Sequence, residues 1–539
     1  MPTAPLLSPM APDSTRQDRW FWGIFICCSL LTILAMYQAE YPPMVDLPQH
    51  AAQIALWKEF GNPALDIGSQ YEVNWFTPYV LAYGLTILLT SFLSVLESLR
   101  LVIIVSLIAF PLSLVFLFRA TGQNQWLSLL GFSLAFGTSF YWGFFNFLVA
   151  LPIGMLFLAQ VFSTPERLRF RDFLILSGYG IAAFFGHMYV WMFNCGLLLP
   201  CIAIRTRSLR SVLIAAASIL PSATLMLLWM PRFLHGEGQF VSTGPAFEFP
   251  GMTDISIRLM QLSLHCFVHL SMFLRIAVCF LLLLIFISVR LRPHARIEFH
   301  IPWIVSALGY LFMPIKFHGV ELVASRFSVF FHATFLMAWH PDPSPVPNGR
   351  RWRPLLAILV LFWLCVVNWQ FHHFAKEESG FDEAVSGTAP GKKVLGLIFQ
   401  SWSRFVPGYP FLHFAAWNQV HKGGMIGFSI ARGFPPLIRF RTGFFFGIPD
   451  KCEGAQTRLE LEGKGDLHTI DWETGRKYRY FIVRTDHDRQ NVLFRDFKEP
   501  VTLIGQANLW WVYERNGPDY QPGPSDIRLR PTDSTDSQR

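Results

Sequence analysis

Apolar runs that are each about as long as a bilayer is thick dominate this sequence and constrain its fold most. The first run spans Trp20–Met36, and further runs recur as far as residue 371. They lie at 76–96, 99–118, 126–142, 144–162, 173–204, 210–230, 271–289, 300–315, 326–340 and 355–371. A helix needs about 20 apolar residues to cross the hydrocarbon core of a membrane. Only 15% of the residues are charged, whereas a soluble chain carries about 25%. The sequence therefore predicts an all-α polytopic membrane bundle.

Basic clusters between the runs predict how the bundle is oriented. Positively charged loops stay on the cytoplasmic side of a membrane. Four such clusters are expected inside, at Arg167–Arg171, Arg205–Arg210, Arg290–Arg296 and Arg350–Arg353. The N-terminus is expected inside as well, because Arg16 and Arg19 precede the first run. The net charge of +8 is thereby explained by membrane topology, and we expect no nucleic acid partner.

One conflict bears on the number of crossings. If 76–162 held four complete crossings, the cluster Arg167–Arg171 would lie outside. One of these segments is therefore expected to be miscounted, broken or re-entrant. The run at 173–204 is long enough for two short crossings, so we expect about 11–13 transmembrane helices in all.

Composition divides the chain into four parts. Residues 1–19 are expected to be a disordered cytoplasmic N-terminus, and 20–371 the transmembrane domain, with outer loops at 39–75 and 231–270. Beyond it, Gly and Pro punctuate strand-like runs at Val394–Phe399, Tyr478–Val483, Val501–Leu503 and Leu509–Tyr513. They predict a small C-terminal α/β extracytoplasmic domain over 372–515. The polar stretch 516–539 is expected to be a disordered tail.

Several motifs are missing from the sequence. There is no Walker A loop, no GxSxG and no HExxH, so nothing points to an ATP-driven pump, a nucleophile-elbow hydrolase or a zincin protease. The eight Cys form no CxxC pair and mostly lie in apolar runs. Neither a disulfide framework nor a structural zinc site is expected.

The most informative polar stretch follows the first run directly and reads Tyr41-Pro-Pro-Met-Val-Asp46-Leu-Pro-Gln-His50. A spacing of four puts Asp46 and His50 on one face of a helix. A carboxylate there can act as a general base on an acceptor hydroxyl. Asp46 and His50 together could also hold a divalent metal such as Mg, Mn or Zn.

A structural role for the same stretch is the alternative. Asp46 and Gln49 match a capping box, which would start an amphipathic helix at Leu47–Phe60. Such a helix would lie on the membrane surface, with Trp57 and Phe60 towards lipid. The two roles are compatible, because a cap holds a carboxylate rigidly.

Other ionisable residues are candidates for substrate binding. Glu40 is either a second carboxylate of the site or an interfacial charge. His187 lies inside an apolar stretch, where an ionisable residue either serves function or makes a packing hydrogen bond. Arg232 belongs to an outer loop and could contact substrate.

A cationic loop precedes the run at 326–340. It contains Lys316, His318 and, at its end, Arg326. Fixed positive charge, and the planar fork of Arg in particular, suits a departing lipid phosphate. The alternative is a solvated loop in which Glu321 pairs with Arg326.

Short motifs along the whole chain carry a family resemblance. They are Asp46-Leu-Pro-Gln-His50-Ala-Ala-Gln, Gly143-Phe-Phe-Asn146-Phe, Phe185-Gly-His187, the Arg326 run, His413-Phe-Ala-Ala-Trp417 and Lys422-Gly-Gly424. In these motifs the chain resembles a group of bacterial polytopic membrane proteins with an Asp-Leu-Pro-(Asn/Gln)-His signature. That group is similar in layout to GT-C glycosyltransferases, which have an essential acidic residue in the first outer loop.

The resemblance implies a GT-C-like fold in the bacterial inner (cytoplasmic) membrane, with a polyprenyl-phosphate-linked sugar donor. The partners would be that lipid-linked donor, membrane lipid, and an acceptor that is a glycan, a lipid or a protein. Asp46 would be the general base for transfer at the outer leaflet. One departure is plain, since many GT-C enzymes have paired acids where this loop has Asp46 with His50.

A non-enzymatic role is the alternative function. A lipid or polysaccharide carrier, or an assembly protein of the cell envelope, would fit the bundle and outer domain equally well. Convergence of Asp46, His50, His187 and Arg326 in space would favour the enzyme.

Overall fold

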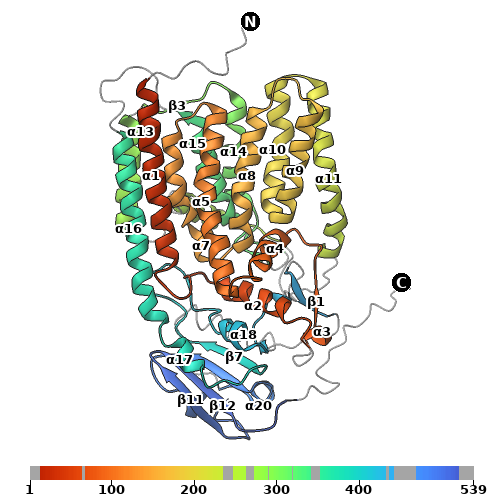
Figure 1. Cartoon of the computed structure of the whole chain (residues 1–539), viewed down its shortest axis with the longest axis vertical. Coiled ribbons are helices and arrows are strands. Elements are labelled where there is room, and N and C mark those ends of the chain that lie inside the picture. The colour runs from red at the N-terminus through yellow and green to blue at the C-terminus, as the bar shows by residue number, and fades with distance from the viewer. Residues whose placement is uncertain are drawn as a thin grey trace, which may run out of the picture.

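The computed structural model describes residues 12–62, 67–234, 247–262, 272–288, 290–317, 320–340, 352–432, 436–441 and 469–520. Two layers make up the chain: a bundle of upright helices and, below it, a small domain built on a sheet (Figure 1). Six helices within the described ranges are long and apolar enough to cross a membrane. They are α1 (Pro12–Met36), α5 (Val95–Thr121), α8 (Phe145–Ser163), α10 (Met188–Thr206), α11 (Leu209–Leu234) and α16 (Trp352–Glu378).

Shorter helices stand among these six (Figure 1). They include α9 (Phe170–Gly186), α13 (Met272–Ser288), α14 (Ile301–Phe312) and α15 (Phe327–Ala338). The prediction of a polytopic helical membrane protein is thereby confirmed, while the expected total of about 11–13 crossings stays a prediction. The last long helix, α16, continues beyond residue 371 to Glu378.

The run at 126–142 is broken rather than one continuous helix. It forms three short pieces, η1 (Gln125–Leu129), α6 (Leu130–Ala135) and α7 (Thr138–Tyr141). Gly137 precedes α7, and Gly143 follows it in the left-handed region with φ +75°. Each piece is far shorter than the roughly 20 residues of a crossing. The run at 76–96 likewise contains only the ten-residue α4 (Val80–Leu89).

The C-terminal domain holds a five-stranded mixed sheet in the order β11-β12-β10-β7-β8. Its strands are β7 (Lys393–Ile398), β8 (Met425–Ile426), β10 (Tyr480–Arg484), β11 (Val501–Ala507) and β12 (Trp510–Arg515). Strand β7 runs parallel to β8 and β10, and β12 runs antiparallel to β10 and β11. Helix α18 (Ala416–Lys422) connects β7 to β8, and α17 (Phe381–Val385) packs on β11. All four predicted strand-like runs are strands of this sheet.

Smaller elements complete the described chain. They are α3 (Ile67–Gln70), β2 (Phe247–Glu248), α12 (Met252–Leu262), β3 (Arg292–Pro293), η3 (Ile297–Phe299), β4 (Lys316–Phe317), β5 (Val320–Glu321), η4 (Ala324–Arg326), β6 (Trp339–His340), η5 (Ile430–Arg432), α20 (Trp472–Gly475) and α21 (Gln490–Leu493). The six Cys in the described ranges are free thiols.

The first loop after α1 is buried between the two layers, and α2 (Leu47–Lys58) forms there as predicted (Figure 1). Its expected position on the membrane surface is wrong, because most of its residues are buried and α18 packs against it. Strand β1 (Tyr71–Val73) of the same loop pairs antiparallel with β9 (Ile438–Phe440). The C-terminal domain thus covers the side of α2 that an isolated helix would turn to lipid or water.

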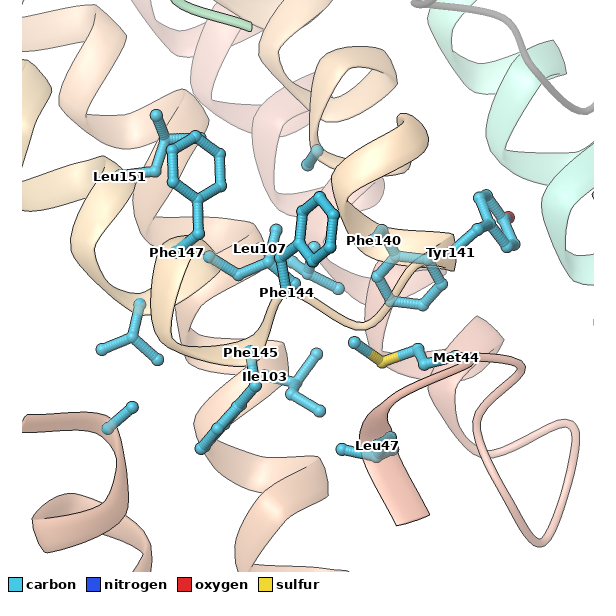
Figure 2. Close-up of a cluster of buried hydrophobic side chains, with 14 of the residues drawn as sticks. Met44, Leu47, Ile103, Leu107, Phe140, Tyr141, Phe144, Phe145, Phe147 and Leu151 are labelled. Carbon is cyan, nitrogen blue, oxygen red and sulfur yellow. The ribbon is translucent and has the colours of Figure 1, made fainter. Parts of the chain in front are cut away.

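Apolar side chains fasten the beginning of this loop to the bundle. Met44 and Leu47 are almost fully buried, and they lie beside Ile103 of α5 and Phe145 of α8 (Figure 2). Burying side chains of this size contributes about 1.5–3 kcal/mol each. Asp46 lies between these two anchors, directly before α2, and is therefore held at the lower end of the bundle.

Candidate active site

The backbone of Asp46 is held by the segment that joins α7 to α8. Val45 N donates to Tyr141 O (2.9 Å), and Asp46 N donates to Trp142 O (3.2 Å). The approach is close enough that a Cβ added to Gly143 would lie 2.7 Å from Asp46 N. Glycine at 143 therefore serves both the left-handed turn and the close passage of the Asp46 backbone.

The Asp46 side chain does not cap α2, so the predicted capping box is wrong. Asp46 is the residue before the helix, but its φ of −90° and ψ of −5° are helical and it makes no side-chain cap hydrogen bond. A capping carboxylate needs an extended backbone to reach the N2 or N3 amide. Gln49 is engaged elsewhere, with its carboxamide bonded to the backbone of Phe428 and Ile430. The carboxylate of Asp46 is consequently directed to other partners.

Two side chains from distant parts of the sequence act on the Asp46 carboxylate. Nε2 of His413, in the C-terminal domain, lies 3.6 Å from Asp46 Oδ1, and the charge of Arg326 also acts on it. Burial raises the pKa of Asp46 to about 7, and Arg326 opposes that rise. The side chain still keeps 31% of its surface accessible. It is thus a poorly hydrated carboxylate that is open on one side and titrates near neutrality.

His50 lies one turn after Asp46 and is tied into a separate chain of hydrogen bonds. Its Nδ1 lies 2.7 Å from the hydroxyl of Tyr83, and the ring also bonds to the backbone of Gly143. The hydroxyl of Tyr83 is bonded in turn to Asn146. Because a carbonyl only accepts, the network assigns the ring N–H to Gly143 and the lone pair to Tyr83. Burial lowers the pKa of His50 to about 4, so it is neutral at pH 7.

These contacts do not fit the predicted metal site at Asp46 and His50. Both ring nitrogens of His50 are already engaged. Within the described ranges, no group of three or more His, Cys, Asp or Glu residues is placed to hold a metal ion.

Arg326 is buried, and its guanidinium faces aromatic rings. It ends η4, and its guanidinium carbon lies 3.8 Å from the ring centroid of Phe144 and 5.5 Å from that of Tyr189. Nη1 donates to Leu322 O (3.0 Å). Its charge interacts with both Asp46 and His187. A fixed, desolvated positive charge of this kind attracts an anion strongly.

His187 is the second candidate residue on which the charge of Arg326 acts. It separates α9 from α10, is 4% exposed, and accepts a hydrogen bond at Nδ1 from Tyr189 N (3.2 Å). The rings of Tyr79 and Phe147 lie 4.9 and 5.3 Å from it, both edge-on. An accepting Nδ1 leaves the proton on Nε2. The charge of Arg326 thus acts on both Asp46 and His187, and His50 lies one helical turn after Asp46.

Glu40 belongs to a different cluster. It is exposed, and its backbone N donates to Glu378 of α16 (2.6 Å). The hydroxyl of Tyr41, the next residue, donates to Asp382 (2.7 Å). A cavity of about 270 Å³ opens here, lined by Glu40, Tyr41, Ala375, Glu378, Ser379, Gly380, Phe381, Asp382 and Glu383.

The remaining predicted residues are less closely tied to Asp46. Lys316 lies on β4, whose backbone pairs with β2 and β5, in the hairpin that leads to η4. Arg232 lies in the last turn of α11 and is partly exposed. His318 is outside the described residues.

His413 is the residue that sequence reasoning missed as a member of the site. It appeared only within the motif His413-Phe-Ala-Ala-Trp417, in a domain expected to be separate from the first loop. That motif was the available signal, since it places a histidine just before a short helix. The pairing with Asp46 depends on the docking of two distant segments, which spacing along the chain does not reveal.

Fold and site define a polytopic helical membrane protein with a small C-terminal sheet domain and a buried polar site between them. The chain is similar to the arabinofuranosyltransferase AftD from mycobacteria, solved by cryo-electron microscopy, with a TM-score of 0.47 and 13% identity. The match covers 95% of this chain and 42% of that one, so this chain spans less than half of AftD. No protein-family model and no curated protein matches the sequence.

Proposed function

We propose that the chain is a membrane glycosyltransferase of the GT-C type in the bacterial inner membrane. It moves a sugar from a polyprenyl-phosphate-linked donor to an acceptor at the outer leaflet, and the C-terminal domain is extracytoplasmic. The observation that carries the proposal is the Asp46 carboxylate, partly open, with a pKa of about 7 and beside the buried charge of Arg326. A general base works best when its pKa lies near the working pH.

Asp46 is the general base of the proposed reaction. The acceptor hydroxyl gives its proton to the carboxylate of Asp46 as its oxygen bonds to the anomeric carbon of the donor sugar. The bond between that carbon and the phosphate oxygen breaks, and the lipid phosphate leaves with the electron pair. Protons and charge balance, since the proton stays on Asp46 and the negative charge leaves on phosphate.

Arg326 and His187 bind the phosphate of the donor in this scheme. Arg326 supplies a permanent positive charge with little water around it, which stabilises charge that develops on the leaving group. Neutral His187 offers its Nε2–H, because Nδ1 accepts from Tyr189 N. Lys316, His318 and Arg232 are proposed to add positive charge along the path of the headgroup. His50 supports the loop at Gly143 through its hydrogen bonds.

Sugar transfer in membranes tests the proposal directly. Vesicles containing the wild type or Asp46→Asn are supplied with a panel of polyprenyl-phosphate sugars, and product and released lipid phosphate are measured. Loss of both in Asp46→Asn is expected, with Asp486→Asn as the control because Asp486 is an exposed carboxylate of the C-terminal domain. Equal transfer by wild type and Asp46→Asn would overturn the base role, and no transfer by the wild type from any donor of the panel would favour a non-enzymatic carrier or assembly protein.

A further inference from the structure

The C-terminal domain contributes a side chain to the carboxylate that the first loop presents. His413 lies between β7 and α18, and its Nε2 is 3.6 Å from Asp46 Oδ1. The imidazole is only 14% exposed. A ring nitrogen this close to Asp46 affects the proposed base directly, whether the ring is neutral or charged. The role of His413 therefore bears on the reaction itself.

The ring of His413 is fixed by stacking. Its plane lies 3° from parallel to the ring of Phe428, with centroids 4.6 Å apart. Phe428 is fixed in turn by Gln49, whose Nε2 donates to Phe428 O (3.0 Å). Gln49 stands in the first turn of α2, just after Asp46. The same helix end therefore positions both the carboxylate and the support of its histidine partner.

The protonation states of the pair decide what His413 can do. Burial lowers the pKa of His413 to about 4 and raises that of Asp46 to about 7. At pH 7 the imidazole is neutral and is a far weaker proton acceptor than the carboxylate. A proton taken from an acceptor hydroxyl accordingly stays on Asp46. A neutral imidazole still carries one N–H, which stabilises the ionised carboxylate when it points there.

We propose that His413 is a positioning residue for Asp46, which the C-terminal domain supplies to complete the site. Its Nε2–H holds Oδ1, so that Oδ2 is presented to the acceptor hydroxyl. The separation of 3.6 Å is longer than a hydrogen bond, and contacts of this kind tighten when substrate is bound. This inference rests on the proposed function, because it concerns the same base.

Other groups that act on Asp46 must be held constant in a test. Among the described residues, the charged and titratable side chains that act on it are Arg326, His413 and Tyr83. His413→Phe keeps an aromatic ring on Phe428 but removes the N–H. His413→Gln keeps an N–H near the position of Nε2. A matched control is His487→Phe, because His487 pairs with Asp486 at 2.6 Å on the exposed surface of the same domain.

The first measurement is the pH profile of sugar transfer by the full-length protein. We expect His413→Phe to lower kcat at least tenfold at pH 7, to leave KM for the donor within twofold, and to move the acidic limb to higher pH. His413→Gln is expected to restore most of kcat, and His487→Phe to match the wild type. A pH profile for His413→Phe identical to that of the wild type would overturn the inference.

A second measurement does not depend on activity. The infrared absorption of the protonated Asp46 carboxyl, identified by its loss in Asp46→Asn, is followed from pH 4 to pH 9. Its midpoint should rise in His413→Phe and stay near the wild-type value in His487→Phe, and an unmoved midpoint in His413→Phe contradicts the proposed contact. If the midpoint moves while the wild type transfers no sugar from any donor, the contact stands and the glycosyltransferase proposal fails.

Discussion

The carboxamide of Gln49 bonds to the backbone on both sides of Ser429. Its Nε2 donates to Phe428 O (3.0 Å), and its Oε1 accepts from Ile430 N (3.2 Å). The side chain of Gln49 thus both donates to and accepts from the backbone of this segment, as a neighbouring strand does in a sheet. Through these two hydrogen bonds Gln49 joins the first loop to the C-terminal domain next to Asp46.

Gln49→Leu removes both hydrogen bonds and leaves backbone groups without partners in a buried place. We expect the free energy of unfolding to fall by about 1–3 kcal/mol, as measured by denaturant titration in detergent. Gln506→Leu, on an exposed position of β11, should change it by less than about 0.5 kcal/mol. Equal stability of both variants would mean that the contact contributes nothing.

Gly143→Ala tests the close passage of the Asp46 backbone. The added methyl group would lie 2.7 Å from Asp46 N at a φ of +75°, so Asp46 must move and transfer activity should be lost. Gly122→Ala is the matched control, since Gly122 has a φ of +74° but no neighbouring atom within 4 Å. It should incur only the left-handed backbone cost of about 1–2 kcal/mol and keep its activity. Comparable loss of activity in both variants would assign the effect to backbone strain.

The pH dependence of transfer follows from the raised pKa of Asp46. Only the ionised carboxylate can accept a proton, so kcat/KM should rise about tenfold per pH unit below pH 7 and level off above it. This limb reflects the pKa of about 7 of Asp46, and the residual activity of Asp46→Asn should lack it. A limb near pH 4 in the wild type would contradict a buried carboxylate at this position.

The raised pKa of Asp46 also makes stability depend on pH, but stability should fall as pH rises, whereas activity should increase. Asp46 binds its proton more tightly in the folded chain, where its pKa is about 7, than in the unfolded chain, where it is about 3.9. Stability from this group is therefore full below pH 4 and is lost as pH rises through 7. Asp46→Asn should raise Tm relative to the wild type at pH 8 and match it only below about pH 4. A lower Tm for Asp46→Asn at pH 8 would indicate that the carboxylate stabilises the fold.

Arg326→Lys separates the shape of the guanidinium from its charge. Lysine keeps the charge but lacks the planar fork that binds two phosphate oxygens. We expect kcat/KM for the lipid-linked donor to fall about 100-fold or more, whereas Arg119→Lys, on the exposed end of α5, should leave it unchanged. A normal kcat/KM in Arg326→Lys would argue against phosphate recognition by Arg326.

Features that depend on local pattern were predictable from the sequence. The apolar runs gave the membrane helices, and two of the runs in the stretch that raised the Arg167–Arg171 conflict, 76–96 and 126–142, form only short helices. The strands of the C-terminal sheet were predicted as well, because Gly and Pro delimit short β-branched runs. Each of these signals is complete within about 20 residues.

Features that depend on long-range docking were not predictable. Gln49 and Gln53 look like the polar face of a surface helix, yet both are about 1% exposed. Their carboxamides bond to backbone groups of the C-terminal domain, at Phe428, Ile430 and Ile438. For the same reason His413 was absent from the predicted site. A single sequence contains no sign that these segments meet.

The pairing of β1 with β9 has a consequence for biosynthesis. The ribosome makes the first loop early, and Asp46 reaches its membrane boundary while the partners of that loop, His413 and β9, are still untranslated. On the proposed function, the nascent chain carries an incomplete site until the C-terminal domain has been made and has folded. A product truncated before residue 413 is then expected to be inactive.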